Sequence, residues 1–466
     1  MFFSRQHLHF AGIGGIGMSG IAEVLLNLGY TISGSDLKLS PTTDRLVKLG
    51  ATVFEGHDAK NLNGAKALVV SSAVNESNAE VQEARRLGIP VIPRGELLAE
   101  LMRLKYGIAI AGSHGKTTTT SMVAAILSHA GMDPTVVVGG KAAAMGGSNA
   151  RVGLSEFLVV ESDESDGSFL KLSPILAVVT NIDREHLDHY ADIQAIRDAF
   201  TEFVNKVPFY GAAIVCLDDD NVQAILPAIR RRKVTYGRSS QADYQPGETE
   251  CEGMHSIFRL RTRSAGSLLA DLGLFRVNSP GAHNVLNATA AIAVALELGV
   301  TPDVARDGLA KFTGVGRRFE IKGEVNGVRV IDDYGHHPTE ILATLAAARS
   351  CCDGRVHVLF QPHRYTRTMH LMDEFARAFH SADRVVLLDI YAASEKPIEG
   401  VTAQALGARM REFGHRDVVY AGSNEAGVKE IVRGVKPGDF IVTLGAGSVS
   451  QLGEKILEGL THAEAA

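Results

Sequence analysis

Short apolar runs, separated by glycine turns and by segments with helical spacing, mark the first part of the chain. They cover residues 7–11, 30–33, 67–70 and 91–92. Apolar runs that alternate with helical segments are typical of parallel strands that helices bury on both faces. This pattern predicts a small α/β domain that ends near residue 105.

Beyond residue 105 the same alternation continues, with apolar runs at 106–110, 135–138, 157–160, 175–180 and 212–216. We expect these runs to form a mostly parallel sheet. Residues 242–275 differ, because their short, polar, alternating segments are typical of a small antiparallel addition. The alanine-rich stretch 285–298 has the composition of a long helix.

A glycine-rich stretch at residues 313–318 breaks the helical pattern and gives the best second boundary. The alternation then resumes, with apolar runs at 328–331, 356–360, 384–388, 417–420 and 439–444. A length of 466 residues also suits about three domains. We therefore predict an α/β protein with three domains, at residues 1–105, 106–314 and 315–466.

Composition and charge narrow the class of protein. A hydrophobic content of 45% and a charged content of 21% are ordinary for a globular protein with a large core. The net charge of −6 and the pI near 6.3 give no reason to expect nucleic acid or a membrane surface as a partner. No apolar run approaches the roughly 18 residues of a membrane span, and the N-terminus does not resemble a signal peptide.

The four cysteines lack the C-x-x-C spacing of metal and redox motifs, and two of them are adjacent: Cys216, Cys251, Cys351 and Cys352. We therefore expect neither a zinc site nor a disulfide framework, and we expect a reducing, cytoplasmic location. The sequence leaves the oligomeric state open.

A candidate phosphate-binding loop joins the run at 106–110 to a helical pattern, with the residues Gly112, Ser113, His114, Gly115, Lys116, Thr117 and Thr118. Glycines let backbone N–H groups face a phosphate, and the following helix N-terminus adds partial positive charge. Lys116, expected as an exposed loop residue, would reach the β/γ-phosphates, and Thr117 would hold Mg²⁺. The first glycine of the strict pattern would fall on Ile110, so an ordinary glycine turn is the alternative. ATP is the expected ligand.

A second glycine turn follows the run at 7–11, with Gly12, Gly14, Gly15, Gly17 and Met18, and an acidic residue, Asp36, follows the next strand. This is the dinucleotide fingerprint, in which a diphosphate lies on the helix N-terminus. Because the fingerprint alone is weak, a tight turn without a ligand and a nicotinamide-dependent oxidoreductase both remain open.

Two strand ends carry candidate metal ligands. Glu161 ends the run at 157–160, and a carboxylate at that edge, beside a phosphate loop, is where Mg²⁺ is normally held. A solvated acidic loop is the alternative. His186 follows the run at 175–180, but histidine is a minority ligand for a hard ion, so the residues alone leave its role open.

Polar residues near the second boundary give weaker signals. Asn284 is either a helix N-cap or a ligand contact, and Asn287 has an amide that suits an adenine edge. Arg317 and Arg318 lie in the expected hinge, where arginines are normally solvated but could reach a transferred phosphate.

Two polar loops follow neighbouring strands of the third domain. Residues 332–338 contain Asp332, Tyr334 and His336, and residues 361–367 contain Arg364 and Arg367. Two arginines three residues apart can face one anion from the same helical turn. We expect these loops to bind a ligand.

Taken together, the chain resembles the Mur ligases, the ATP-dependent amide-forming enzymes of peptidoglycan precursor synthesis, over nearly its whole length. The resemblance rests on the order and spacing of residues 9–20, 112–118, 161–166 and 332–338. It implies a Rossmann-like UDP-sugar domain, a central P-loop ATPase-type domain and a C-terminal Rossmann-like amino-acid domain. It also implies the alanine-adding branch, whose substrates are UDP-N-acetylmuramate, L-alanine and ATP, with Mg²⁺.

The same resemblance assigns roles to residues. It gives UDP-sugar contacts to the first glycine turn, to Asp36 and to Ser71 and Ser72, and Mg²⁺ roles to Thr117, Glu161 and His186. It makes Lys116, Glu161, His186 and Arg317 catalytic, with ATP contacts from Asn284, Asn287, Arg317 and Asp332. The amino acid is expected among Tyr334, His336, Arg364 and Arg367.

The chain departs from the family pattern at two places. No lysine lies between Lys171 and Lys206, so the carbamylated lysine of several Mur ligases is absent, as it is in the alanine-adding branch. The late glycine-rich loop ends in Ser448, where the family often has aspartate, so the contacts of this loop depart from the family pattern.

Overall fold

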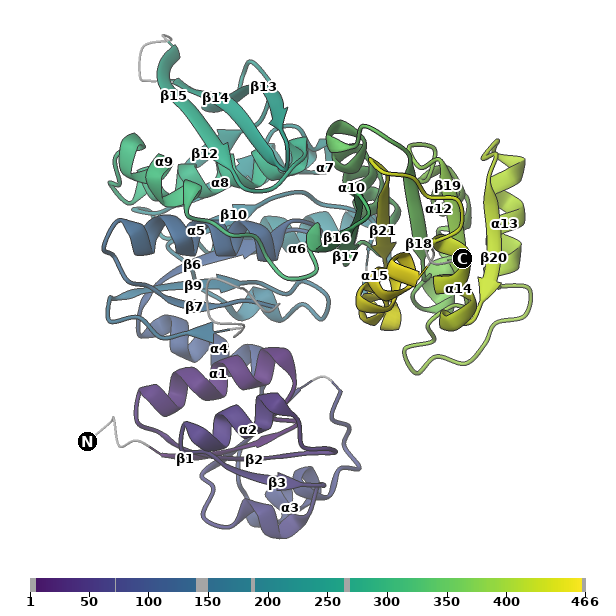
Figure 1. The fold of residues 1–466 in the computed structure, drawn as a ribbon. Coiled ribbons are helices and arrows are strands. Elements are labelled where there is room, and N and C mark those ends of the chain that lie inside the picture. Colours follow the sequence, from purple (N-terminus) through teal and green to yellow (C-terminus); the bar gives the residue numbers. More distant parts are fainter. Residues whose placement is uncertain (1–5, 72, 140–149, 186–188, 264–268, 463–466) are drawn as a thin grey trace. The chain divides into compact units, whose positions relative to one another are not determined.

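A computed structural model of the protein describes residues 6–71, 73–139, 150–185, 189–263 and 269–462. Among these residues the strands form three sheets (Figure 1). The chain divides into two compact units. Unit 1 holds Met1–Gly247, Arg259–Phe275 and Leu286–Thr313, and unit 2 holds Glu248–Phe258, Arg276–Val285 and Gly314–Ala466.

The first sheet is parallel, with strand order β3-β2-β1-β4-β5. Its strands are β1 (His7–Ala11), β2 (Thr31–Asp36), β3 (Thr52–Glu55), β4 (Ala67–Val70) and β5 (Val91–Pro93). The helices between them are α1 (Ile16–Asn27), α2 (Pro41–Lys48), α3 (Ala79–Leu87) and α4 (Arg94–Arg103). The turn from β1 to α1 lies beside the end of β2, because the two strands pair in parallel.

The second sheet has the order β15-β14-β13-β12-β11-β10-β6-β9-β7-β8. Its strands are β6 (Tyr106–Ala111), β7 (Thr135–Val137), β8 (Ala150–Arg151), β9 (Phe157–Glu161), β10 (Leu176–Val179), β11 (Ala212–Cys216), β12 (Lys233–Tyr236), β13 (Tyr244–Glu252), β14 (His255–Arg263) and β15 (Leu269–Val277). The helices are α5 (Lys116–His129), α6 (Ile193–Asn205), α7 (Asp220–Ile225), α8 (Ala282–Glu297) and α9 (Pro302–Ala310). β6 lies between β9 and β10 and pairs with both in parallel.

The third sheet has the order β16-β17-β21-β18-β19-β20, with only β16 antiparallel to its neighbour. Its strands are β16 (Glu320–Val325), β17 (Val328–Asp333), β18 (Val356–Phe360), β19 (Arg384–Leu388), β20 (Val418–Gly422) and β21 (Phe440–Leu444). The helices are α10 (Pro338–Cys351), α11 (Tyr365–His370), α12 (Met372–Arg377), α13 (Ala403–Glu412), α14 (Asn424–Ile431) and α15 (Leu452–His462). β21 lies between β17 and β18.

These sheets confirm the predicted α/β class, with three domains and mostly parallel strands. The expected addition at residues 242–275 is present as β13, β14 and β15. Arg263 N at the end of β14 donates to Asp243 O just before β13, so these two strands run antiparallel. The boundaries at residues 105/106 and 314/315 stay a prediction.

The central strands of the second and third sheets are almost wholly apolar and buried. β6, β10 and β11 in the second sheet, and β18 and β21 in the third, have buried side chains along nearly their full length. Burial on both faces fixes these strands, so the loops at their carboxyl ends start from a rigid base. No helix among the described residues is long and apolar enough to cross a membrane.

Candidate active site

The phosphate loop joins β6 to α5 through two glycines with positive φ. Gly112 has a φ of 132°, and a Cβ there would lie 2.0 Å from Thr180 Oγ1. Gly115 has a φ of 83°, and its Cβ would lie 2.5 Å from Asn287 Oδ1. Only glycine fits either position, because any side chain would meet both strain and a clash.

The loop after β10 holds the phosphate loop in place. Asn181 accepts from the His114 N–H at 2.8 Å and donates from Nδ2 to the His114 carbonyl at 3.0 Å. Asp183 N donates to Ser113 Oγ at 2.8 Å, and the Asp183 carboxylate lies 2.9 Å from His114 Nε2. Sequence reasoning missed Asn181 and Asp183, although the polar run at this strand end was a usable signal.

Lys116 is the most constrained side chain of the loop. Its Nζ donates to the Gly112 carbonyl at 2.6 Å, to the Ser113 carbonyl at 3.2 Å and to Glu164 Oε1 at 2.7 Å. The expectation of an exposed lysine was wrong, since its side chain is only 15% exposed and that of Glu164 only 2%. Burial opposes its charge, but the Glu164 carboxylate outweighs burial and raises the pKa of Lys116.

Thr117 and Glu161 lie together, as expected from the pairing of β6 with β9. Thr117 Oγ1 donates to Glu161 Oε1 at 3.0 Å, and the other carboxylate oxygen accepts from Gly139 N at 2.6 Å. A hydroxyl and a carboxylate are the oxygen ligands that Mg²⁺ prefers, so the pair fits this ion. His186, the third expected ligand, lies outside the described residues.

The two asparagines near the second boundary have separate surroundings. Asn287 Oδ1 accepts from Thr119 Oγ1 at 3.2 Å, so this side chain packs on the first turn of α5. Asn284 Nδ2 donates to the Pro280 carbonyl at 2.8 Å. Asn284 is not an N-cap, because α8 begins at Ala282 and Asn284 therefore lies within its first turn.

The first glycine turn is packed from two sides by charged residues. Gly14 N donates to Asp36 Oδ2 at 2.9 Å, so Asp36 holds the turn. At Gly17 a Cβ would lie 2.3 Å from a guanidinium nitrogen of Arg94, the first residue of α4. Arg94 also donates to Asp163 Oδ2 at 3.2 Å. Sequence reasoning did not identify Arg94, since nothing in the chain near it marks it as close to this turn.

The other residues expected at the UDP-sugar site lie around the same turn. Gly12 has a φ of 77°, and its Cβ would lie 3.9 Å from Ser71 Oγ. Gly15 N donates to the Gly12 carbonyl at 3.2 Å, which closes the turn. Met18 is 2% exposed and packs in the core beneath. Ser72 lies outside the described residues.

In unit 2, Arg317 is held at the end of β17. Its guanidinium donates to Asp332 Oδ2 at 3.3 Å and to the Gly445 carbonyl at 2.6 Å. Asp332 is 1% exposed and also accepts from Thr443 Oγ1 at 2.7 Å. Both oxygens of Asp332 are therefore engaged inside the unit. Ser448, at the end of the same glycine-rich loop, accepts from Gln361 Nε2 at 3.2 Å.

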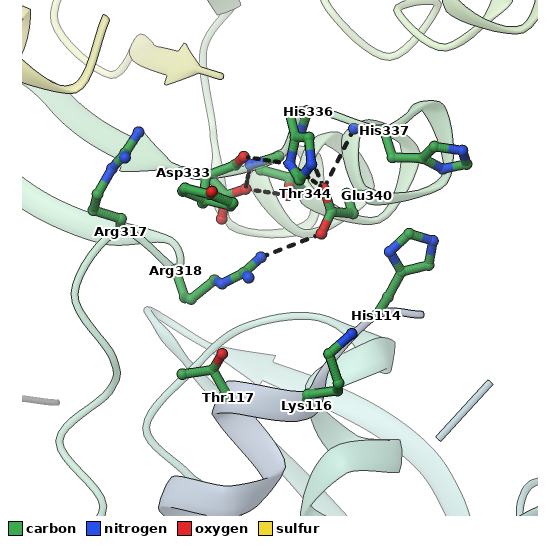
Figure 2. Close-up of polar contacts among 12 residues, drawn as sticks. His114, Lys116, Thr117, Arg317, Arg318, Asp333, His336, His337, Glu340 and Thr344 are labelled. Atoms are coloured by element: carbon green, nitrogen blue, oxygen red, sulfur yellow. Dashed lines mark hydrogen bonds and ion pairs between the residues drawn. The ribbon is translucent and has the colours of Figure 1, made fainter. Parts of the chain in front are cut away.

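Two arginines lie against the ring of Tyr334. The guanidinium carbons of Arg317 and Arg318 are 4.8 and 5.0 Å from its ring centroid. Arg318 also donates to Glu340 Oε1 at 3.3 Å, and Figure 2 shows its guanidinium directed at that carboxylate. Glu340 Oε2 accepts from the backbone N–H of His336 at 3.0 Å. Glu340, which sequence reasoning missed, thus fixes the loop that carries Tyr334 and His336.

The two arginines of the next loop have different partners. Arg364 Nε donates to Glu395 Oε1 at 2.6 Å, so a carboxylate already accompanies this charge. Arg367 Nη1 lies 3.4 Å from His363 Nδ1. Burial, together with the nearby charges of His336 and the two arginines, lowers the pKa of His363 to about 4, so it is neutral near pH 7. Arg364 and Arg367 both lie near the N-terminal end of α11, but only Arg364 is paired with the Glu395 carboxylate.

Family models match three consecutive parts of the chain. They are the Mur ligase family catalytic domain at residues 7–106, the Mur ligase middle domain at 110–295 and the Mur ligase glutamate ligase domain at 317–447. A glycine turn, a phosphate loop and a polar C-terminal loop pair fall within these three matches in that order. The chain belongs to the Mur ligase family.

Individual relatives show which members of the family this chain is similar to. A protein of Solibacter usitatus (strain Ellin6076), named UDP-N-acetylmuramate–L-alanine ligase, is 70% identical over 460 residues, which cover 99% of this chain and 96% of that protein. The crystal structure of UDP-N-acetylmuramate–alanine ligase from Thermotoga maritima matches with a TM-score of 0.80 and 27% identity, covering 99% of this chain and 100% of that one. A murein peptide ligase from Psychrobacter arcticus matches with a TM-score of 0.70 and 26% identity, covering 98% of each chain.

Proposed function

We propose that this protein joins L-alanine to the lactyl carboxylate of UDP-N-acetylmuramate at the expense of ATP, in peptidoglycan precursor synthesis. The observation that carries the proposal is the 70% identity, across 99% of the chain, to a relative that bears the name of this activity. The free thiols and the nucleotide substrates suit a cytoplasmic location, which we include in the proposal.

The chemistry requires activation of the carboxylate, because attack on it pushes electrons onto an already anionic group. ATP transfers its γ-phosphoryl group to a carboxylate oxygen, which gives an acyl phosphate and ADP. The amine of L-alanine then attacks the acyl carbon, the amide forms and inorganic phosphate leaves. Phosphoryl transfer of this kind depends mainly on positioning and on charge neutralisation.

In this proposal Lys116 and the loop amides bind the β/γ-phosphates. The position of the Lys116 ammonium supports that role, because its Nζ donates to the carbonyls of Gly112 and Ser113 within the loop itself. Thr117 and Glu161 would hold Mg²⁺, which supplies positive charge beside the phosphates when it is bound. We assign Arg317 to the transferred phosphate, with Asn284, Asn287 and Asp332 in the ATP site.

The nucleotide sugar is assigned to the first glycine turn. The N-terminus of α1 offers N–H groups and partial positive charge to a diphosphate. Asp36 and Arg94 support that geometry at two positions of the turn, Asp36 through Gly14 and Arg94 through its close approach to Gly17. We therefore add Arg94 to the residues proposed to position the UDP-sugar.

The amino acid is assigned to the loops after β17 and β18. Among the described residues of unit 2, Arg364 is paired with the Glu395 carboxylate, whereas Arg367 lies beside the neutral His363 ring, so Arg367 is the better candidate for the L-alanine carboxylate. Tyr334 and His336 stand 5.0 Å apart, centroid to centroid, and would limit the size of the side chain. A pocket of this kind discriminates one methylene by about 1–3 kcal/mol.

A coupled assay of phosphate release tests the proposal. A related recycling ligase, which adds a ready-made tripeptide to the same nucleotide sugar, is the alternative within the family. The full-length protein is therefore given ATP, Mg²⁺ and UDP-N-acetylmuramate, with L-alanine, glycine, L-serine or such a tripeptide as acceptor. We expect the highest kcat/KM with L-alanine, and weaker turnover with glycine and L-serine. Preference for the tripeptide would instead place the protein with the murein peptide ligases.

Two further outcomes would contradict the proposal. Phosphate release that is independent of any amino acid would indicate an ATP-driven switch without amide chemistry. Binding of NAD or NADP at micromolar concentration, measured by calorimetry, would favour an oxidoreductase and would remove the glycine turn from the UDP-sugar site. We expect neither nucleotide to bind or to change the coupled assay.

A further inference from the structure

Two cysteines that lie far apart in the sequence meet in unit 2. Cys251 lies near the end of β13, and Cys351 is the last residue of α10. Their Sγ atoms are 3.0 Å apart, although 100 positions separate them in the chain. This distance exceeds the length of a disulfide bond, about 2.04 Å, by only about 1 Å.

The two cysteines are partly exposed to solvent, and Cys351 also packs against the core of unit 2. Both residues are partly exposed. Cys351 packs at the edge of the apolar core of unit 2, together with Cys352 and Met254. Ser350 Oγ lies 3.6 Å from each of the two Sγ atoms, so a hydroxyl borders the place where the sulfurs meet.

The side chain of the neighbouring Cys352 contacts other groups than Cys251. Its Sγ contacts the carbonyl of Gly438 at 3.4 Å and that of Arg355 at 3.6 Å. The geometry therefore selects one pair of sulfurs from three nearby cysteines.

We propose that Cys251 and Cys351 form a reversible disulfide, which makes this contact between β13 and α10 a redox modification site. In the reduced protein the two thiols stand in contact, and oxidation joins them with little movement of the backbone. The bond would close a loop of the chain that begins in the β13 hairpin and ends in the third domain.

The oxidant that we assign is a peroxide, and the step balances with it. The sulfur of Cys251 attacks one oxygen of hydrogen peroxide, the O–O bond breaks and a sulfenic acid forms, and the departing hydroxide takes up the thiol proton to become water. The sulfur of Cys351 then attacks the sulfenic sulfur, the S–S bond forms and the sulfenic oxygen leaves as water. Two thiols are oxidised in total, and one peroxide is reduced to two molecules of water.

The order of these two steps follows from the setting of each sulfur. Burial, together with the hydrogen bond to Cys251, raises the pKa of the Cys351 thiol to about 12, so Cys351 is a neutral thiol in the neutral range. Cys251, which lies in a strand end beside the exposed residues Glu252 and Gly253, meets the peroxide first.

Mass spectrometry of the full-length protein tests the pair directly. The reduced protein is treated with hydrogen peroxide, its remaining thiols are alkylated under denaturing conditions, and it is digested without reductant. We expect one dominant linked peptide pair that joins Cys251 to Cys351, with Cys216 and Cys352 recovered as alkylated thiols. Dithiothreitol should abolish the link, and the oxidised protein should show a higher Tm than the reduced one, because the cross-link restricts the unfolded chain.

Matched variants separate this pair from general oxidation. C251S and C351S should each eliminate the linked peptide, whereas C352S, which changes the adjacent residue, should retain it. Thermal unfolding of each variant in the presence of reductant checks that it folds. The proposal is overturned if peroxide leaves both thiols free in the wild-type protein, if it links Cys251 to Cys352, or if the links formed lie between molecules. Because the readout is a covalent bond, the result does not depend on the proposed ligase activity.

Discussion

At the scale of single residues, we expect Lys116 to contribute both to catalysis and to the stability of the folded protein. Lys116→Ala should lower kcat by about 100-fold or more, because a positioned charge at the transition state is lost. It should also destabilise the protein, because Glu164, with its side chain 2% exposed, would lose its cationic partner. Steady-state kinetics and thermal unfolding measure the two effects.

A second variant separates these two effects of Lys116. In Lys116→Ala combined with Glu164→Gln, the buried carboxylate is replaced by a neutral amide, so part of the stability should return while activity does not. Near-normal turnover in the single variant would show that this loop does not bind the transferred phosphate.

Arg367 tests the amino-acid site. Arg367→Ala should raise the KM for L-alanine strongly and leave the KM values for ATP and UDP-N-acetylmuramate nearly unchanged, because a guanidinium grips a carboxylate through two hydrogen bonds. Arg377→Ala, on the next helix, is a suitable control, since that guanidinium lies over the ring of Phe413 instead. A change in the KM for ATP alone would move Arg367 to the phosphate site.

At the scale of elements, the N-terminus of α10 depends on Glu340. This residue completes a capping box with His337 and accepts from the backbone N–H of His336. Glu340→Ala should therefore lower the free energy of unfolding by about 1–2 kcal/mol. Glu340→Gln retains the acceptor and should cost less, and the exposed Glu458→Ala on α15 should cost almost nothing. Urea denaturation compares the three variants, and equal losses for Ala and Gln at position 340 would argue against the capping role.

A comparison of the predicted and observed strands shows which parts of the fold follow from the sequence. The strands at 7–11, 212–216, 356–360 and 384–388 have the predicted bounds, because a strand buried on both faces is an uninterrupted apolar run. The strands β3, β12 and β16 were missed. Each has exposed or half-buried positions, so no apolar run marks it.

In the candidate site, too, the residues at strand ends were predicted and their partners in loops were not. Thr117 and Glu161 were expected together, and they are, because β6 and β9 pair in parallel and bring their carboxyl ends to one edge. Glu164, Asn181, Glu340 and Glu395 could not be predicted as partners. Their contacts depend on loop conformations, which no periodicity in the sequence encodes.

At the scale of the whole molecule, histidines make stability depend on pH. The pKa values of His363 and His283 are lowered to about 4, chiefly by burial, from an ordinary value of 6.5. Between these values the unfolded chain binds protons that the folded chain does not, so stability falls as the pH drops from 6.5 towards 4. Each histidine contributes at most about 3 kcal/mol to this loss.

Urea denaturation at pH 7 and at pH 5 measures this dependence. His363→Gln should reduce the difference between the two midpoints, whereas His370→Gln, an exposed neighbour on α11, should leave it unchanged. A protein equally stable at both pH values would show that these histidines are protonated in the folded state.

The ion pair between Lys116 and Glu164 has a consequence for how the phosphate loop meets its ligand. In this structure the ammonium is already satisfied by a carboxylate and by two carbonyls of its own loop. A nucleotide that takes Lys116 for its phosphates must displace the Glu164 carboxylate, whose side chain is only 2% exposed. Binding at this loop is therefore an exchange of counter-ions, in which a phosphate replaces the Glu164 carboxylate as the partner of the Lys116 ammonium.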